Sequence, residues 1–123
     1  MSGQHNTGAT YAISLSGSTS ITAGTGVTLE SLNDNTGTIA LLSSGGIDGG
    51  SGTVLMRAAN YAFGGADRTI TTTGVLTIEP DADENSFASS FDNQYLNPVS
   101  VTGLTLGKSS NASAITLSRA ISL

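Results

Sequence analysis

Three carboxylates in this chain could act together as acid and base. Asp48, Asp67 and Glu79 fall near equivalent turns of a repeating pattern, so a coiled chain could stack them on one face. Enzymes that cleave polysaccharides need such clustered acids, because one carboxyl group donates a proton while another acts as base or nucleophile. Isolated acids that keep the surface solvated explain the same residues more simply. We therefore predict no catalytic residue among them, and a carbohydrate-active protein is the alternative.

A second group of acids could bind calcium. Asp81, Asp83 and Glu84 carry the hard oxygen ligands that Ca²⁺ prefers, but their spacing fits no EF-hand loop. The glycine-rich run 45–52 resembles a calcium-binding nonapeptide, yet Val54 stands where the second copy needs an aspartate. No Lys-Ser/Thr pair follows this run, so it is not a P-loop either. The sequence predicts no metal site and no cofactor.

Histidine and cysteine chemistry is nearly absent. His5 is the one histidine and lies in a polar N-terminal stretch, and the chain has no cysteine. These facts exclude disulfides, thiolate metal ligands and cysteine nucleophiles, and they leave no partner set for a serine–histidine triad. We expect a protein that is not an enzyme.

Hydroxyl groups suggest a third kind of surface. Outward threonines could form a flat array of the sort that ice-binding solenoids use: Thr22, Thr28, Thr71, Thr77, Thr105 and Thr116. Threonine is also a common residue on exposed strands, which is the simpler explanation. Asn111-Ala112-Ser113 matches a glycosylation sequon, which has no meaning in a bacterial protein.

Composition limits the partners. The net charge is −5, and the four cationic residues are scattered, which argues against a nucleic-acid surface. No apolar run approaches the roughly 20 residues of a membrane helix, so we expect no membrane insertion. Charged residues make up 11% of the chain and aromatic residues 5%. Such values predict a thin layered core of small aliphatic side chains rather than an ordinary globular core.

A repeated phrase supplies that layered core. The aliphatic residues at 13, 15, 21, 27 and 29 return at 39, 41, 47, 54 and 56, with offsets of 26 or 27 residues. Taking Ile21, Ile47, Ile70 and Val101 as equivalents extends the phrase along the chain. A repeat of roughly 20 to 30 residues built from short strands and glycine turns predicts a solenoid.

Alternation within each strand divides its side chains between two faces. Residues two apart share a face, so the aliphatic pairs point inward while Ser14, Thr28 and Ala40 face outward. The two prolines, Pro80 and Pro98, are expected outside the repeated strands. The predicted core is Ile13, Leu15, Ile21, Val27, Leu29, Ile39, Leu41, Ile47, Val54, Ile70, Leu76, Ile78, Leu104, Leu106, Ile115 and Leu117.

The stretch 80–98 breaks the pattern. Phe87, Phe91 and Tyr95 are four residues apart, and acids precede them where a helix would begin. This spacing predicts one short helix near 83–96, inserted between two coils. The domain prediction is a flexible tail over 1–10 and one β-solenoid over 11–123, with 80–98 as the insertion.

The phrase resembles repeat units of large bacterial surface adhesins, the filamentous-haemagglutinin-like, β-strand-repeat proteins. The resemblance lies in the run 69–80, which contains Leu-Thr-Ile-Glu-Pro, in 103–111, which contains Leu-Thr-Leu-Gly-Lys-Ser, and in 114–117. The segments 27–29, 33–35 and 37–41 are similar to another unit. The resemblance implies a right-handed parallel β-helix, here of about five coils, exported to the cell surface.

The function expected from this reading is structural or adhesive. The partners would be a glycan or protein receptor of a host or matrix, and like coils stacked end to end. The alternatives left open are a carbohydrate-binding or carbohydrate-active β-helix, and a self-assembling filament subunit. The last coil carries no polar cap, and an uncapped strand edge invites pairing.

Overall fold

The computed structural model describes residues 13–31, 36–42, 45–64, 68–82 and 84–121. Short strands follow one another around an elongated core, and the described residues contain no helix. The strands are β1 (Ile13–Leu15), β2 (Ile21–Thr22), β3 (Val27–Glu30), β4 (Thr38–Leu41), β5 (Gly45–Asp48), β6 (Val54–Arg57), β7 (Asn60–Phe63), β8 (Arg68–Thr71), β9 (Val75–Glu79), β10 (Phe91–Asp92), β11 (Leu96–Val99), β12 (Gly103–Leu106) and β13 (Ile115–Thr116).

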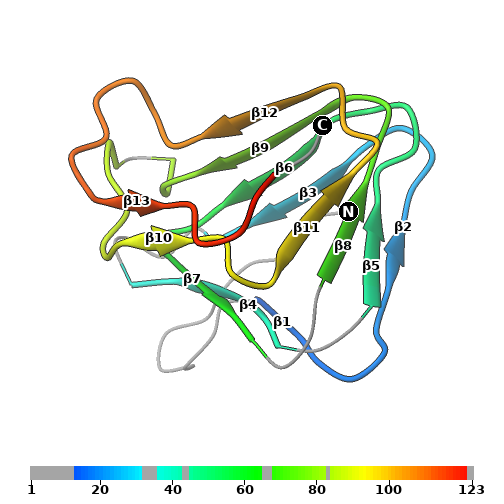
Figure 1. Ribbon diagram of the computed structural model, residues 1–123, viewed down its shortest axis with the longest axis horizontal. Helices are drawn as coiled ribbons and strands as arrows, with labels where there is room; N and C mark the ends of the chain where they lie inside the picture. The colour runs from blue at the N-terminus through cyan, green and yellow to red at the C-terminus, as the bar shows by residue number, and fades with distance from the viewer. Residues whose placement is uncertain (1–12, 32–35, 43–44, 65–67, 83, 122–123) are drawn as a thin grey trace.

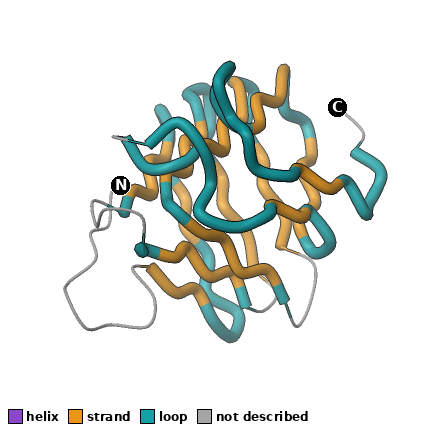
Figure 2. The backbone as a smooth tube through the Cα atoms, turned by 90° about the vertical axis from the view of Figure 1, so that its left-hand side faces the viewer, coloured by secondary structure: helices purple, strands orange, loops and turns teal. Residues whose placement is uncertain are grey.

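Every third strand lies beside its predecessor, so the chain winds as a parallel β-solenoid (Figures 1 and 2). Two four-stranded sheets run β2-β5-β8-β11 and β3-β6-β9-β12, and a three-stranded sheet runs β1-β4-β7. A two-stranded sheet, β10-β13, continues the coil after β7. All nine strand pairs are parallel. The solenoid has about four turns, fewer than the five coils predicted.

The repeat offsets of the first two coils are confirmed. Ile13 and Leu15 pair with Ile39 and Leu41, and Ile21 pairs with Ile47. The Val27 and Val54 positions also pair. The alignment fails later, because Pro98 and not Val101 lies opposite Ile70. Pro98 therefore stands inside a strand, contrary to the sequence prediction.

The core is a set of aliphatic columns that run along the solenoid. Ile47 and Ile70 are fully buried on one sheet, and Val54 and Leu76 are fully buried on another. Each buried aliphatic side chain contributes roughly 1.5 to 3 kcal/mol. Of the predicted core, Ile13, Leu104 and Leu106 are partly buried and pack against it. Ile115 and Leu117 are exposed, so their assignment to the core was wrong.

The predicted helix near 83–96 was also wrong. The described residues from 84 onward form bends, β10 and the start of β11. Their backbone bonds go to neighbouring coils: the Ala88 N–H donates to the Ala59 carbonyl at 2.9 Å, and the Phe91 N–H donates to Ala114 at 2.9 Å. Helical spacing was misleading here because the aromatic side chains are core residues of a coil rather than a stripe on a helix.

Those aromatic residues extend the aliphatic columns. Tyr61 lies opposite Ile39 and Phe63 opposite Leu41, and the rings of Phe87 and Phe91 stack at 5.5 Å. Tyr61 contacts both phenylalanines edge to face at 5.7 Å. The cluster closes the corner where β7 has no strand paired beyond it.

Outward positions also differ from the prediction at one residue. Ser14 is exposed and Thr28 partly exposed, as expected, but Ala40 is fully buried. Ala40 lies in the middle strand of the three-stranded sheet, between Ser14 and Ala62. The outer side of that sheet is therefore covered at its centre.

Replacing Ile70 with alanine tests the columns. Ile70→Ala should lower the free energy of unfolding by roughly 2 to 5 kcal/mol, because a buried cavity replaces contacts with two neighbouring coils. Chemical denaturation followed by circular dichroism measures the change. Thr105→Ala, at an exposed position, is the control and should change stability by less than about 0.5 kcal/mol. Equal effects of the two substitutions would contradict the assigned core.

Candidate functional site

The three acids of the carbohydrate hypothesis are not gathered. Asp48 lies on β5 and faces Thr22 and Thr71 in register. Its Oδ1 accepts a hydrogen bond from the Gly50 N–H at 2.9 Å, which closes a turn. Glu79 lies on β9, in a different sheet, and pairs with Arg57. Asp67 is outside the described residues. The structure thus separates Asp48 from Glu79.

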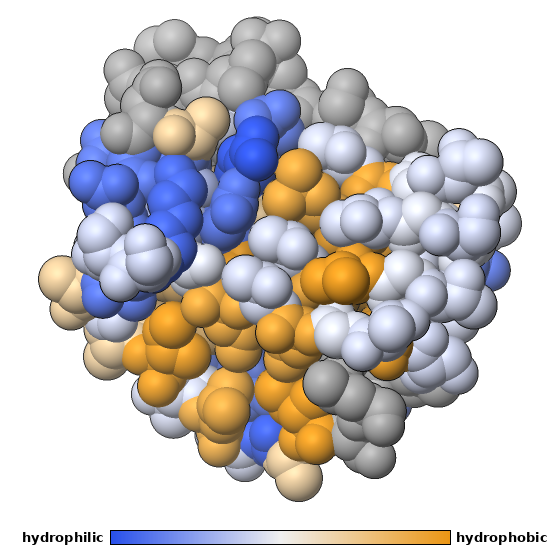
Figure 3. All heavy atoms as spheres, turned by 90° about the horizontal axis from the view of Figure 1, so that it is seen from above, coloured by the Kyte–Doolittle hydropathy of each residue, from blue (hydrophilic) through white to orange (hydrophobic). Residues whose placement is uncertain are grey.

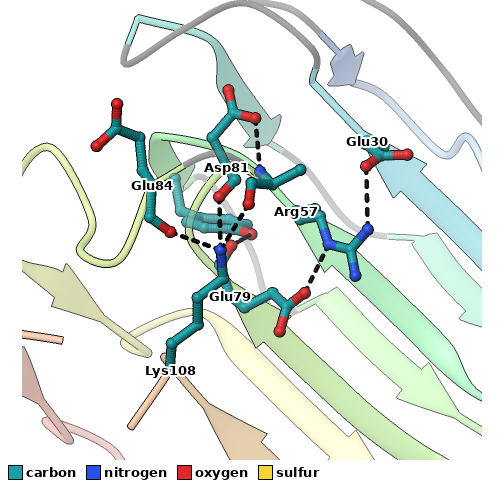
Figure 4. A network of polar contacts seen from close by, with 8 residues as sticks. Glu30, Arg57, Glu79, Asp81, Glu84 and Lys108 are labelled. Carbon is teal, nitrogen blue, oxygen red and sulfur yellow. Dashed lines mark hydrogen bonds and ion pairs between the residues drawn. The ribbon is translucent and has the colours of Figure 1, made fainter. Parts of the chain in front are cut away.

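A lysine occupies the acidic loop proposed as a calcium site. The Lys108 Nζ donates to the backbone carbonyls of Asp81 at 2.8 Å, Ala82 at 3.1 Å and Glu84 at 2.5 Å (Figure 4). This ammonium supplies the positive charge at those three oxygens. Asp83 is outside the described residues. Among the residues that the structure describes, no cluster of three or more metal-ligating side chains occurs.

The threonines do not form one array. Thr28, Thr77 and Thr105 share a column on the outer face of β3-β6-β9-β12, but Leu55 interrupts it. On the neighbouring sheet Asp48 separates Thr22 from Thr71. Thr116 lies on β13, in a third sheet. The hydroxyl surface is therefore divided among sheets and broken within each of them.

The sequon asparagine is engaged in the fold. Asn111 Oδ1 accepts from the Phe87 N–H at 3.2 Å, and its Nδ2 donates to the Ser113 carbonyl at 2.8 Å. Its side chain thus links the last turns to the aromatic corner. His5 lies outside the described residues.

Sequence reasoning missed a column of charges. Glu30, Arg57 and Glu79 pair in register on three successive strands (Figure 4). Arg57 Nε donates to Glu79 Oε1 at 2.5 Å, and Nη1 donates to Glu30 Oε1 at 3.1 Å. The pKa of Arg57 is raised, chiefly by the hydrogen bond to Glu79. The offsets of 27 and 22 residues match those of the adjacent aliphatic pairs and were a usable signal.

A second arginine was also missed, and it is fully buried. Arg68 begins β8 and extends past Gly45 of the coil below. Its Nη1 donates to the Thr19 carbonyl at 2.7 Å and its Nη2 donates to Leu15 at 3.2 Å, two coils away. Burial lowers the pKa of Arg68. The residue type alone gives no sign that this arginine points inward.

The outer surface combines polar and apolar areas. Figure 3, which looks down on the side where β12 lies uppermost in Figure 1, shows hydrophobic residues gathered beside a strongly hydrophilic block. Val75, Ile115 and Leu117 are the large hydrophobic residues exposed in the described part of the chain. No pocket was found in the structure.

Comparisons with known proteins add no assignment. No family model matches the chain, no curated protein matches it, and no solved structure matches it. None of the described helical segments could span a membrane, since the described residues form no helix. The class shown is a parallel β-solenoid, and it rests on strand pairing alone.

Gly45 allows Arg68 to pass, and its substitution tests this arrangement. A Cβ at Gly45 would lie 2.2 Å from the Thr19 carbonyl oxygen and 2.8 Å from Arg68 Nη1, and the residue has φ of +134°. Gly45→Ala should therefore cost at least about 2 kcal/mol of stability. Gly24→Ala is the matched control, because a Cβ there meets nothing within 4 Å. Thermal and chemical denaturation that left the two variants equally stable would contradict this account.

Tyr61 makes stability sensitive to alkaline pH. Its hydroxyl donates to the Glu79 carbonyl at 2.7 Å, and burial raises its pKa well above the usual 10.0. The folded state thus favours the protonated phenol. This contribution is complete below the unfolded pKa of about 10 and is lost as pH rises through the higher folded value. We expect unfolding measurements from pH 8 to 12 to show a fall that Tyr61→Phe reduces. An unchanged fall in that variant would assign the alkaline loss to other groups.

Proposed function

We propose that this chain is a non-catalytic structural and adhesive segment of a large exported bacterial surface protein. The observation that carries the proposal is the continuation of sheets in register from coil to coil. Such an architecture lengthens by repetition and presents sheet faces along its sides. The resemblance of the runs 69–80 and 103–111 to adhesin repeats supports the same assignment, together with the right-handed winding and cell-surface location of that family.

The outer face of β2-β5-β8-β11 is the surface we assign to receptor binding. It carries small polar side chains in neighbouring positions, among them Thr22, Asp48, Thr69, Thr71 and Asn97. Hydroxyl, carboxylate and amide groups on a flat sheet can exchange hydrogen bonds with sugar hydroxyls or with a protein surface. Asp48, which sits between two threonines, adds a negative charge to this face.

The carbohydrate-active alternative has less support. Retaining and inverting glycosidases place two carboxyl groups roughly 5 to 9.5 Å apart across one bond. Asp48 and Glu79 are on different sheets, and Glu79 is held by Arg57. A binding role needs no such pair. The filament alternative is favoured by one observation, the partial exposure of Leu104 and Leu106 in the last coil.

A glycan panel tested for both binding and cleavage examines this proposal. Bound glycan should be released unchanged, with no product at any pH. Thr71→Lys should weaken binding at least tenfold, because a long charged side chain covers the centre of the assigned face. Thr77→Lys is the matched control, since Thr77 is equally a partly exposed outward residue, but on the other four-stranded sheet.

Two results would contradict the proposal. Product release that Asp48→Asn abolishes would make the protein an enzyme. Binding that falls with Thr77→Lys and persists with Thr71→Lys would move the receptor surface to the sheet that bears Arg57.

A further inference from the structure

The last coil leaves part of the core uncovered. Leu104 and Leu106 on β12 are partly exposed, whereas Leu76 and Ile78, their partners on β9, are fully buried. β12 is the final strand of its sheet, as β11 is of the neighbouring sheet. The third side is already occupied, because β13 lies on β10. Two strand edges therefore remain to be considered at this end.

The edge of β11 cannot bond a further strand through its N–H groups. In a parallel ladder, alternate residues direct their N–H and C=O groups to the same neighbour. The Arg68 N–H donates to Tyr95 at 2.8 Å, so Leu96 and Pro98 face away from β8. The Leu96 N–H donates to the Asn93 carbonyl at 3.0 Å, and proline has no N–H. Pro98 thus protects this edge, as proline does on natural edge strands.

The edge of β12 has the opposite character. The Gly107 N–H donates to the Ile78 carbonyl at 2.8 Å, so alternation directs Thr105 and Gly107 toward β9. Leu104 and Leu106 then direct their N–H and C=O groups away from β9. No strand of the described residues lies on that side. Ile115, itself exposed, is next to the end of β12, because its Cδ1 lies 3.3 Å from a Cβ built on Gly107.

We propose that the free edge of β12 binds one extended chain segment in parallel, with aliphatic side chains at alternate positions. The sheet itself defines this occupant. Its strands carry Val27-Thr28-Leu29, Leu76-Thr77-Ile78 and Leu104-Thr105-Leu106 at equivalent positions. A segment with the same phrase would cover Leu104 and Leu106, and it would pair with the N–H and C=O groups of both residues. The site does not depend on the adhesive role.

The occupant is a separate extended segment rather than a second folded copy. Val27 and Leu29, at the other end of this sheet, are only 1% and 2% exposed. The N-terminal end therefore gains little apolar burial from stacking on another molecule. Two chains that each carry a net charge of −5 also repel one another at low ionic strength. The free edge thus fits an extended peptide better than it fits a blunt solenoid end.

Residue-specific amide exchange tests the site with a peptide of residues 73–80, Thr-Gly-Val-Leu-Thr-Ile-Glu-Pro. By NMR, the Leu104 and Leu106 amides should exchange quickly in the chain alone and at least tenfold more slowly with saturating peptide. The Gly107 amide, already bonded to Ile78, should not change. A control peptide with serine in place of its leucine and isoleucine should give no protection.

Variants test the same edge by fluorescence anisotropy with a labelled peptide. Leu106→Pro removes an outward N–H and keeps the Gly107 bond, so binding should weaken roughly tenfold. Thr105→Ala should bind as the parent does. Should Leu106→Pro fail to fold, the exchange pattern alone decides. The proposal is overturned if millimolar peptide protects neither leucine amide, or if the serine peptide binds equally well. Protection that increases with protein concentration in the absence of peptide would also overturn it, by making a second copy the occupant.

Discussion

Parallel, in-register stacking of each coil on the one before is the constraint on which the other features depend. Neighbouring strands lie about 4.8 Å apart, so each side chain rests on the side chain one coil earlier. Aliphatic residues accordingly form columns, as at Ile21, Ile47 and Ile70. The same closeness limits the turns. A Cβ at Gly52 would lie 1.8 Å from the Thr25 carbonyl oxygen, so only glycine allows these two turns to stack.

Cationic side chains serve this stacking as well. Arg57 joins three successive strands through Glu30 and Glu79, and Arg68 joins the third coil to the first. Lys108 fastens the last turns to the carbonyls of the acidic loop. A lone charge in a layered core is costly unless it is bonded. Three of the four lysine and arginine residues are thus committed to contacts between coils, which agrees with the lack of a basic surface inferred from their scatter.

The sequence was most informative where the repeat is regular. Offsets of 26 and 27 residues identified the paired strands of the first two coils, because a fixed period is the direct record of stacking. The period changes after Ile78, and inference failed there. The four-residue spacing of Phe87 and Phe91 suits a helix as well as a coil corner, and only contact with Tyr61 distinguishes the two. Pro98 was misplaced because its missing N–H falls on an unpaired edge, where it breaks no ladder bond. Of the surface features, the charge column followed from the offsets, whereas the buried Arg68 did not.

Engineered disulfides measure the register most directly. Thr28 and Leu55 are outward partners on adjacent parallel strands, so their Cα atoms should lie about 4.8 Å apart, within the range that a disulfide spans. Thr28 and Arg57 are displaced by two residues, about 8 Å, which is too far. In a chain without other cysteines, the Thr28→Cys/Leu55→Cys variant should oxidise to an intramolecular disulfide under native conditions, and Thr28→Cys/Arg57→Cys should keep free thiols. Closure of the second pair in preference to the first would contradict in-register parallel stacking.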